Sequence, residues 1–141
     1  MVVYFDSSAL VKLLLGEQHS DLAHGLWNDC DSVVASPLAF VEVHAALAAA
    51  RRSRRLGHGT YQRLVDDWED AWPAVRVVRL TDDLATDAGR LAAAHGLTGA
   101  DAVHLASALA VGRDHVVLFA FDQRLHAAAR AAGLATVPAA L

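Results

Sequence analysis

The feature that most limits the fold is a set of short apolar runs separated by helical patterns. The chain opens with Val-Val-Tyr-Phe at residues 2–5, a run of β-branched and aromatic side chains with no polar alternation. Such a run is typical of a strand buried on both faces of a parallel sheet. Further strands are expected at residues 32–35, 75–80, 116–119 and 135–137. Because helical segments separate these strands, the pattern predicts a three-layer α/β/α fold with a central parallel sheet of about four to five strands.

Capping residues mark where the helices begin and end. Ser36 followed by Pro37 combines an N-cap with proline at the first helical position. Thr81 and Thr98 are expected to cap two later helices, which end at glycines. One helix is expected between Asp6 and residue 16, and the others at residues 20–28, 38–52, 60–72, 82–95, 99–111 and 122–132, with a break at 55–59.

Length and composition predict one domain over residues 1–141. With 55% hydrophobic residues, the chain can form one sizeable core but is too short for two ordinary domains. No apolar run reaches the roughly 20 residues that a membrane-spanning helix needs, and no signal peptide is visible. A lone cysteine, Cys30, excludes an intrachain disulfide and fits a reducing compartment. We therefore expect a cytoplasmic protein with no membrane partner.

Four acidic residues are expected near the edge of the parallel sheet at which ligands bind. Asp6 and Asp122 follow predicted strands, while Glu42 and Asp101 lie near the starts of predicted helices. The loops at the carboxyl edge of such a sheet open onto a crevice, so all four are expected to project toward one edge. The three aspartates also fit simpler roles at helix N-termini. Glu42 does not, because it lies on the apolar stripe of its helix, where a charge is costly unless it is paired or bound to a cation.

A cluster of carboxylates favours a metal ion. Four like charges in one cleft repel each other unless a divalent cation offsets them. Oxygen ligands with no neighbouring cysteine or helical histidine pair favour a hard cation, Mg²⁺ or Mn²⁺. His104, three residues after Asp101, is expected as a core or supporting residue, and Lys12 as a solvated one. The sequence therefore predicts a metal centre at Asp6, Glu42, Asp101 and Asp122.

Four segments carry a resemblance to a known family. They are DSSALVKLLL (6–15), PLAFVEVHAAL (37–47), TGADAVHLASAL (98–109) and FDQRLHAAARAAGL (121–134). In this order, they resemble the PIN-domain ribonucleases, and within that family the VapC toxins of toxin–antitoxin modules. The resemblance spans nearly the whole chain. It implies that Asp6, Glu42, Asp101 and Asp122 are catalytic and bind the metal, and that Ser8 supports the site.

The resemblance also implies an activity and partners. It implies a Mg²⁺- or Mn²⁺-dependent endoribonuclease, the toxin of a type II pair, that hydrolyses single-stranded or loop RNA with metal-activated water. It further implies a homodimer and a cognate antitoxin whose tail occupies the groove beside the acidic site. One position departs from the family pattern: Ala120 stands where the family often has serine or threonine.

A basic cluster and several alternative functions remain open. Arg51, Arg52, Arg54 and Arg55 lie close together in a chain of net charge −4. The negative net charge argues weakly against a nucleic-acid partner. The arginine cluster could contact RNA phosphates or an acidic partner, or it could only offset the negative end of a helix macrodipole. The alternatives are a housekeeping RNA-processing nuclease and a non-catalytic RNA- or metal-binding module. A phosphatase with an aspartyl nucleophile is disfavoured, because Ser8 stands where its second acid belongs.

Overall fold

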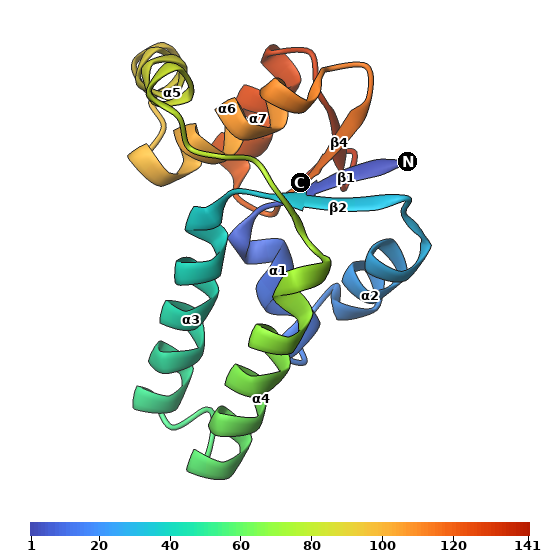
Figure 1. The fold of residues 1–141 in the computed structure, drawn as a ribbon, viewed down its shortest axis with the longest axis vertical. Coiled ribbons are helices and arrows are strands. Elements are labelled where there is room, and N and C mark those ends of the chain that lie inside the picture. The colour runs from blue at the N-terminus through green and yellow to red at the C-terminus, as the bar shows by residue number, and fades with distance from the viewer.

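The computed structural model describes residues 1–141 and contains a five-stranded parallel sheet with helices on both faces (Figure 1). Its strands lie in the order β3-β2-β1-β4-β5, and every neighbouring pair is parallel. The strands are β1 (Val2–Phe5), β2 (Ser32–Ala35), β3 (Arg76–Val77), β4 (Val116–Phe119) and β5 (Ala135–Val137). The predicted three-layer α/β/α fold is confirmed.

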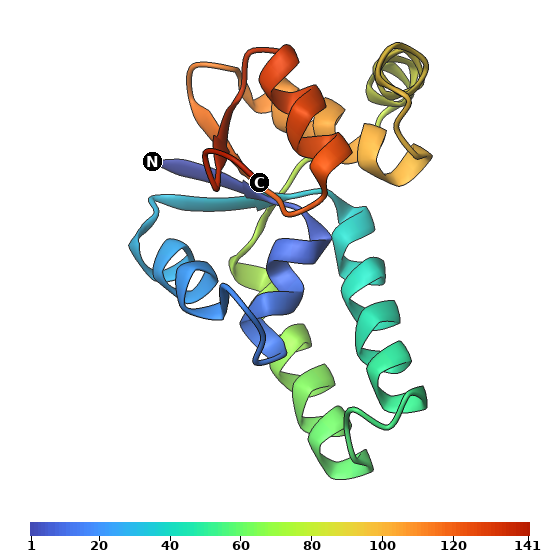
Figure 2. The same cartoon turned by 180° about the vertical axis from the view of Figure 1, so that it is seen from behind.

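Seven α-helices cover the two faces of the sheet. They are α1 (Ser7–Leu14), α2 (Ser20–Asp29), α3 (Pro37–Arg52), α4 (His58–Ala71), α5 (Asp82–His95), α6 (Gly99–Val111) and α7 (Gln123–Ala131), with a short 3₁₀ helix, η1 (Trp72–Ala74), after α4. Helices α1 to α4 lie on one side of the sheet and α5 to α7 on the other, as Figures 1 and 2 show from opposite directions. None of the helices has the length and apolarity needed to cross a membrane.

The central strand is buried on both sides, as its sequence predicts. Val3 and Phe5 belong to the core on the α1–α4 side, whereas Tyr4 belongs to the core on the α5–α7 side. This division follows from the alternation of side chains along a strand. Each face of the sheet therefore has its own apolar layer, and β1 anchors both.

Most predicted boundaries lie within one residue of the observed ones, and two elements differ by more. The strand expected at 75–80 pairs only at Arg76 and Val77, because β3 is an exposed edge strand with β2 as its single neighbour. The helix expected from residue 60 begins at His58, since Gly57 serves as its N-cap and Gly59 is accommodated in the first turn. Neither difference moves an element that carries a predicted site residue.

Candidate active site

Asp6 lies where β1 ends and α1 begins. Its backbone N–H donates to the carbonyl oxygen of Phe119 in β4 (3.1 Å), and its Oδ1 accepts from the backbone N–H of Ala9 (2.9 Å). Asp6 is therefore the N-cap of α1. The residue is only 4% exposed, and this burial is the main reason that the pKa of Asp6 is raised to about 6. Helix capping uses Oδ1 and leaves Oδ2 without a hydrogen bond from the protein.

Ser8 connects Asp6 to the loop that follows β4. Its Oγ donates to Asp6 Oδ1 (2.7 Å) and accepts from the backbone N–H of Phe121 (3.3 Å). Phe121 directly precedes Asp122. Ser8 therefore lies in the predicted position beside Asp6 and fixes the spacing between two acidic segments that are far apart in the sequence.

Glu42 is partnered by a serine and a histidine. It lies in the second turn of α3, and its Oε1 accepts from Ser7 Oγ (2.5 Å) and from His104 Nε2 (2.6 Å). The histidine is itself held by the hydroxyl of Tyr4, 2.8 Å from Nδ1. Burial alone would raise the pKa of Glu42, but the hydrogen bonds from His104 and Ser7 outweigh it and hold that pKa below its usual range.

This geometry corrects one sequence expectation. The apolar stripe of α3 predicts a buried Glu42 whose charge a cation would offset, yet its side chain is 32% exposed and already paired with His104. His104 is confirmed as a supporting residue. Ser7 is a site neighbour that the sequence pattern does not single out.

Asp101 lies in the first turn of α6, and Asp122 is the N-cap of α7. The backbone N–H of Asp101 donates to Thr98 Oγ1 (3.2 Å), and Asp122 Oδ1 accepts from the N–H of Leu125 (2.9 Å). Both aspartates therefore occupy the predicted positions at helix N-termini. Ala120, two residues before Asp122, is fully buried in the core and contributes no polar group.

The four carboxylates share one electrostatic environment. Burial raises the pKa of Asp101, and the negative charges of Asp122 and Glu42 raise it further. The charge of Asp101 in turn contributes to the raised pKa of Asp6. The structure thus brings the four predicted residues, from α1, α3, α6 and α7, to the same edge of the sheet.

The donor set fits a hard divalent cation, although it is not a preformed cage. No three Asp, Glu, His or Cys side chains are arranged in the structure as a ready set of metal ligands. Raised carboxyl pKa values mark charges that the protein leaves partly uncompensated, and a divalent cation would offset them. Carboxylate oxygens are the ligands that Mg²⁺ and Mn²⁺ prefer.

A groove of about 350 Å³ lies beside these acids, between α1 and α3. Its lining is Ser7, Ser8, Val11, Lys12, Glu17, Glu42, Ala46 and Phe121. Lys12 is expected from the sequence on a solvated face, but the residue lines this groove, and its Nζ lies 4.5 Å from the centre of the Phe121 ring. A larger hollow of about 610 Å³ lies between α5 and α6 and contains none of the four acids.

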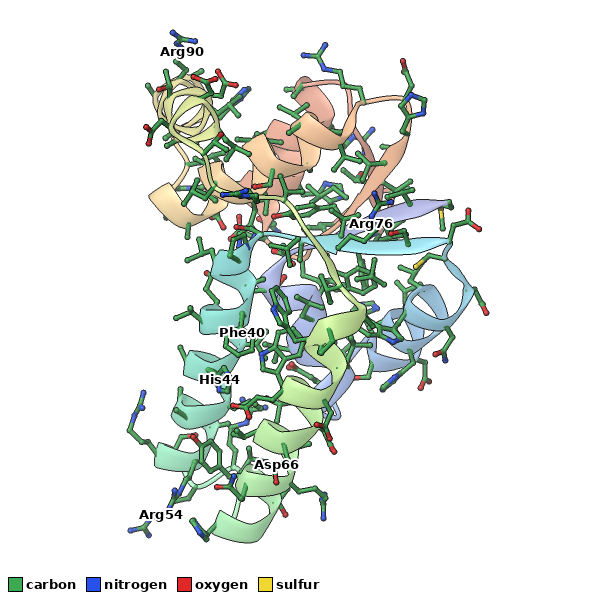
Figure 3. The ribbon with its side chains drawn as sticks, viewed as in Figure 1. Phe40, His44, Arg54, Asp66, Arg76 and Arg90 are labelled. Atoms are coloured by element: carbon green, nitrogen blue, oxygen red, sulfur yellow. The ribbon has the colours of Figure 1, made fainter.

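The arginine cluster is not part of the acidic site. Arg51, Arg52, Arg54 and Arg55 are exposed at the turn between α3 and α4, and Figure 3 shows Arg54 at the tip of this hairpin. Arg51 lies nine residues beyond Glu42, which is about 13 Å along the helix axis. No salt bridge in the structure involves any of the four arginines.

Comparisons with known proteins identify similar sequences and folds. The sequence model of the PIN domain matches residues 3–131. Ribonuclease VapC45 of Mycobacterium tuberculosis (strain CDC 1551 / Oshkosh) is 53% identical over 140 residues, covering 99% of this chain and 97% of that protein.

Solved structures share the fold at lower identity. Mycobacterium tuberculosis VapC20, described as a sarcin-ricin loop cleaving toxin, is 24% identical with a TM-score of 0.67, covering 89% of this chain and 94% of that one. A toxin–antitoxin complex from Klebsiella pneumoniae contains a chain that is 17% identical with a TM-score of 0.63, covering 86% of this chain and 87% of that one.

Proposed function

The chain belongs to the PIN-domain family, among the VapC ribonucleases, and on that premise we propose that it is a metal-dependent endoribonuclease, the toxin of a type II toxin–antitoxin pair. The observation that carries the proposal is the meeting of Asp6, Glu42, Asp101 and Asp122 at one edge of the sheet, with raised pKa values at two of them. Residues 1–141 then act as a single nuclease domain.

The proposed chemistry divides between the metal and the protein. A Mg²⁺ or Mn²⁺ ion, when bound, lowers the pKa of water and stabilises charge on the phosphate. Asp6 would hold it through Oδ2, with Asp101 and Asp122 supplying further carboxylate oxygens. Glu42 would act through Oε2, as ligand or water orienter, because Oε1 is occupied by Ser7 and His104. Ser8 would keep Asp6 in place.

The proposed substrate is single-stranded or loop RNA, cut at internal phosphodiester bonds. The naming of the 53% identical relative as a ribonuclease supports RNA as substrate, and splayed strands expose their phosphates to a shallow cleft. We further propose that the protein acts in the cytoplasm as a homodimer and is held by a cognate antitoxin. The toxin–antitoxin complex with the same fold supports the antitoxin partner.

The test of the nuclease is cleavage of RNA by the purified protein. It should cleave with Mg²⁺ or Mn²⁺ and lose the activity in Asp6→Asn and in Asp101→Asn. Asp87→Asn is the matched control, because Asp87 is an exposed residue of α5 that pairs with Arg90. Equal cleavage in the presence of EDTA would contradict the metal mechanism, and Mn²⁺ binding without any hydrolysis would favour a non-catalytic module.

Growth of a host bacterium separates a toxin from a housekeeping nuclease. Expression of this chain alone should arrest growth, whereas expression of the Asp101→Asn variant should not. Normal growth with a cleavage-competent protein would favour the housekeeping role.

The proposal extends to the arginine cluster at the α3–α4 turn. Four exposed arginines without carboxylate partners suit the phosphates of an RNA strand that reaches beyond the acidic site. Reversing the charges of Arg51 and Arg52 should weaken RNA binding and flatten its salt dependence. An unchanged salt dependence would show that the cluster is a solvated surface that does not contact the RNA.

A further inference from the structure

One cation lines the groove beside the acidic residues, and the proposed chemistry does not use it. Lys12 is the only lysine among the twelve lysine and arginine residues of the chain, and the other eleven are arginines. Ser8 and Lys12 are four residues apart on α1, so they project from the same side of the helix and both line the groove. The distance between them along the helix is one turn, about 6 Å. Lys12 therefore lies one helical turn from the serine that bonds Asp6.

The ammonium group of Lys12 is positioned but not neutralised. Its Nζ lies over the Phe121 ring, in the arrangement of a cation–π interaction. It forms no salt bridge, although the carboxylates of Glu17 and Glu42 line the same groove. An ammonium group has three N–H donors and no acceptor. Because the ring face offers no lone pair, these donors remain free for an anion.

The surface that positions Lys12 is tied to the acidic site. The backbone N–H of Phe121 donates to Ser8 Oγ, and Asp122 follows in the chain. The ring of Phe121 is stacked with His19, with centroids 5.1 Å apart and an interplanar angle of 22°. The Phe119 ring meets it edge-on at 5.1 Å. The cation is therefore held in a fixed relation to Asp6 and Asp122.

We propose that Lys12 binds the RNA phosphate adjacent to the one that is cut, so that the strand leaves the acidic site along the groove between α1 and α3. This inference rests on the proposed ribonuclease function. An RNA cut at the acidic edge must place its next phosphate within about one nucleotide of it. In this groove, Lys12 is the one cationic side chain among the lining residues. A polyanion that follows this groove from the acids therefore meets a compensating charge at Lys12.

Binding of a fluorescent, mixed-sequence, single-stranded oligoribonucleotide tests the inference. The measurement uses Mg²⁺ and an Asp101→Asn background, so that the RNA is not consumed. Lys12→Met should weaken binding by about tenfold and reduce the slope of log affinity against log salt by roughly 0.7, the effect of one phosphate contact on a single strand. Lys12→Arg should keep the slope.

Arg90→Met is the matched control for the loss of one positive charge. Arg90 is 77% exposed on α5, on the other side of the sheet, and Figure 3 shows it projecting away from the molecule. The Arg90→Met variant should leave the RNA affinity and the slope of log affinity against log salt unchanged. An Arg90→Met effect equal to that of Lys12→Met would assign the loss to net charge and overturn the inference.

Chemical modification gives a second measurement that needs no substitution at Lys12. An amine-reactive reagent can modify only the Lys12 side chain and the N-terminal amine, since the chain has no other lysine. The N-terminal amine pairs with Asp31 at the opposite end of β1 and serves as the internal reference. Bound RNA should slow the labelling of Lys12 several-fold, relative to Met1, in peptides quantified by mass spectrometry.

The outcomes separate this inference from the function on which it rests. If the unmodified protein cleaves RNA while Lys12→Met keeps full affinity and slope, or RNA leaves Lys12 labelling unchanged, the inference is overturned and the ribonuclease proposal stands. If the protein neither cleaves nor binds RNA, the ribonuclease proposal itself fails. Selective protection of Lys12, with the expected change in slope, supports the inference even if Lys12→Met proves less stable.

Discussion

At the scale of single residues, the contact with the clearest consequence joins His104 to Glu42. The histidine side chain is 2% exposed and lies between the Tyr4 hydroxyl and the Glu42 carboxylate. His104→Ala should reduce the free energy of unfolding by about 1–3 kcal/mol, because a buried hydroxyl loses its partner. It should also reduce cleavage by about 10- to 100-fold, the usual cost of losing a group that orients a ligand carboxylate.

Two variants separate orientation of Glu42 from general stability. His104→Gln retains an N–H donor and should recover part of the rate, whereas Tyr4→Phe leaves the His104–Glu42 bond intact and should mainly affect stability. Cleavage rates and thermal unfolding of the three variants distinguish the two effects. Full activity in His104→Ala would show that Glu42 needs no such partner.

Asp6 predicts an unusual pH dependence for the metal-free protein. Burial raises its pKa from 3.8 to about 6, so folding favours the protonated form. The stability that this group contributes is complete below about pH 4 and is lost as the pH rises through about 6. Asp6→Asn keeps an oxygen that can accept from the N–H of Ala9 but removes the buried charge. It should therefore stabilise the metal-free protein at pH 8, by up to about 3 kcal/mol.

Urea unfolding in EDTA at several pH values checks this prediction. The advantage of Asp6→Asn should shrink between pH 6 and pH 4 and vanish at the lower value. Adding Mg²⁺ at pH 8 should then reverse the order, because a ligand that binds only the native state stabilises it by mass action. An advantage of equal size at all pH values would contradict a raised pKa at Asp6.

The positions of the candidate site residues could be predicted from sequence where the signal was local. Asp6, Asp101 and Asp122 each stand beside a turn or cap, and Glu42 interrupts an apolar stripe. The supporting contacts are different in kind, because Ser7 and Glu42 are 35 residues apart and Tyr4 and His104 are 100 residues apart. No spacing rule connects such pairs, so only the fold could assign them. The contact between Lys12 and Phe121 also joins residues far apart in the sequence, and this is why the sequence predicts a solvated Lys12.

At the scale of elements, two threonine caps of the same kind allow a matched comparison. Thr98 Oγ1 accepts from the N–H of Asp101 at the start of α6, and Thr81 Oγ1 accepts from Leu84 at the start of α5, both at 3.2 Å. Replacing either threonine with alanine should cost about 1 kcal/mol of stability. Only Thr98→Ala should also slow RNA cleavage, because of these two helices only α6 carries an acidic residue of the site.

Thermal unfolding and cleavage assays on the two variants test this difference. Thr98→Ser, which keeps the hydroxyl, should restore both stability and rate. Equal loss of cleavage in Thr81→Ala and Thr98→Ala would mean that activity follows overall stability rather than the position of Asp101.

Element boundaries were predictable where both ends carried a signal. Helix α5 begins after Thr81 and ends at Gly96, whose φ of +64° favours glycine, and its predicted range of 82–95 is the observed one. Strand β3 is shorter than predicted because its length depends on pairing with β2, a tertiary event with no local signature. Capping is local chemistry, whereas edge pairing is not.

At the scale of the whole molecule, the strand order explains where the acids meet. The chain moves from β1 outward to β2 and β3, and then returns to place β4 on the other side of β1. The helices that follow β1 and β4 lie on opposite faces of the sheet, α1 on one and α7 on the other (Figures 1 and 2). In a parallel sheet, such a reversal opens a crevice at the carboxyl ends of the two strands. Asp6 and Asp122 stand at that crevice.

This topology predicts that metal binding connects the two sides of the molecule. Asp6 and Glu42 come from helices on one side of the sheet, and Asp101 and Asp122 from helices on the other. A cation shared by them should oppose local opening on both sides, so Mg²⁺ should slow amide hydrogen exchange at residues 6–10, 99–104 and 121–126. At a concentration 100 times its dissociation constant, the stabilisation is about 2.7 kcal/mol.

Hydrogen exchange followed by mass spectrometry, with and without Mg²⁺, resolves these segments. The hairpin tip at residues 51–58 is the internal control, because it lies far along α3 from Glu42 and should exchange equally in both conditions. Asp101→Asn should weaken the protection on both sides together, since losing one carboxylate ligand lowers the affinity for an ion that both sides share. Protection confined to one side of the sheet would instead show that the two pairs of acids do not share an ion, and that the crevice between β1 and β4 is not the place where this nuclease acts.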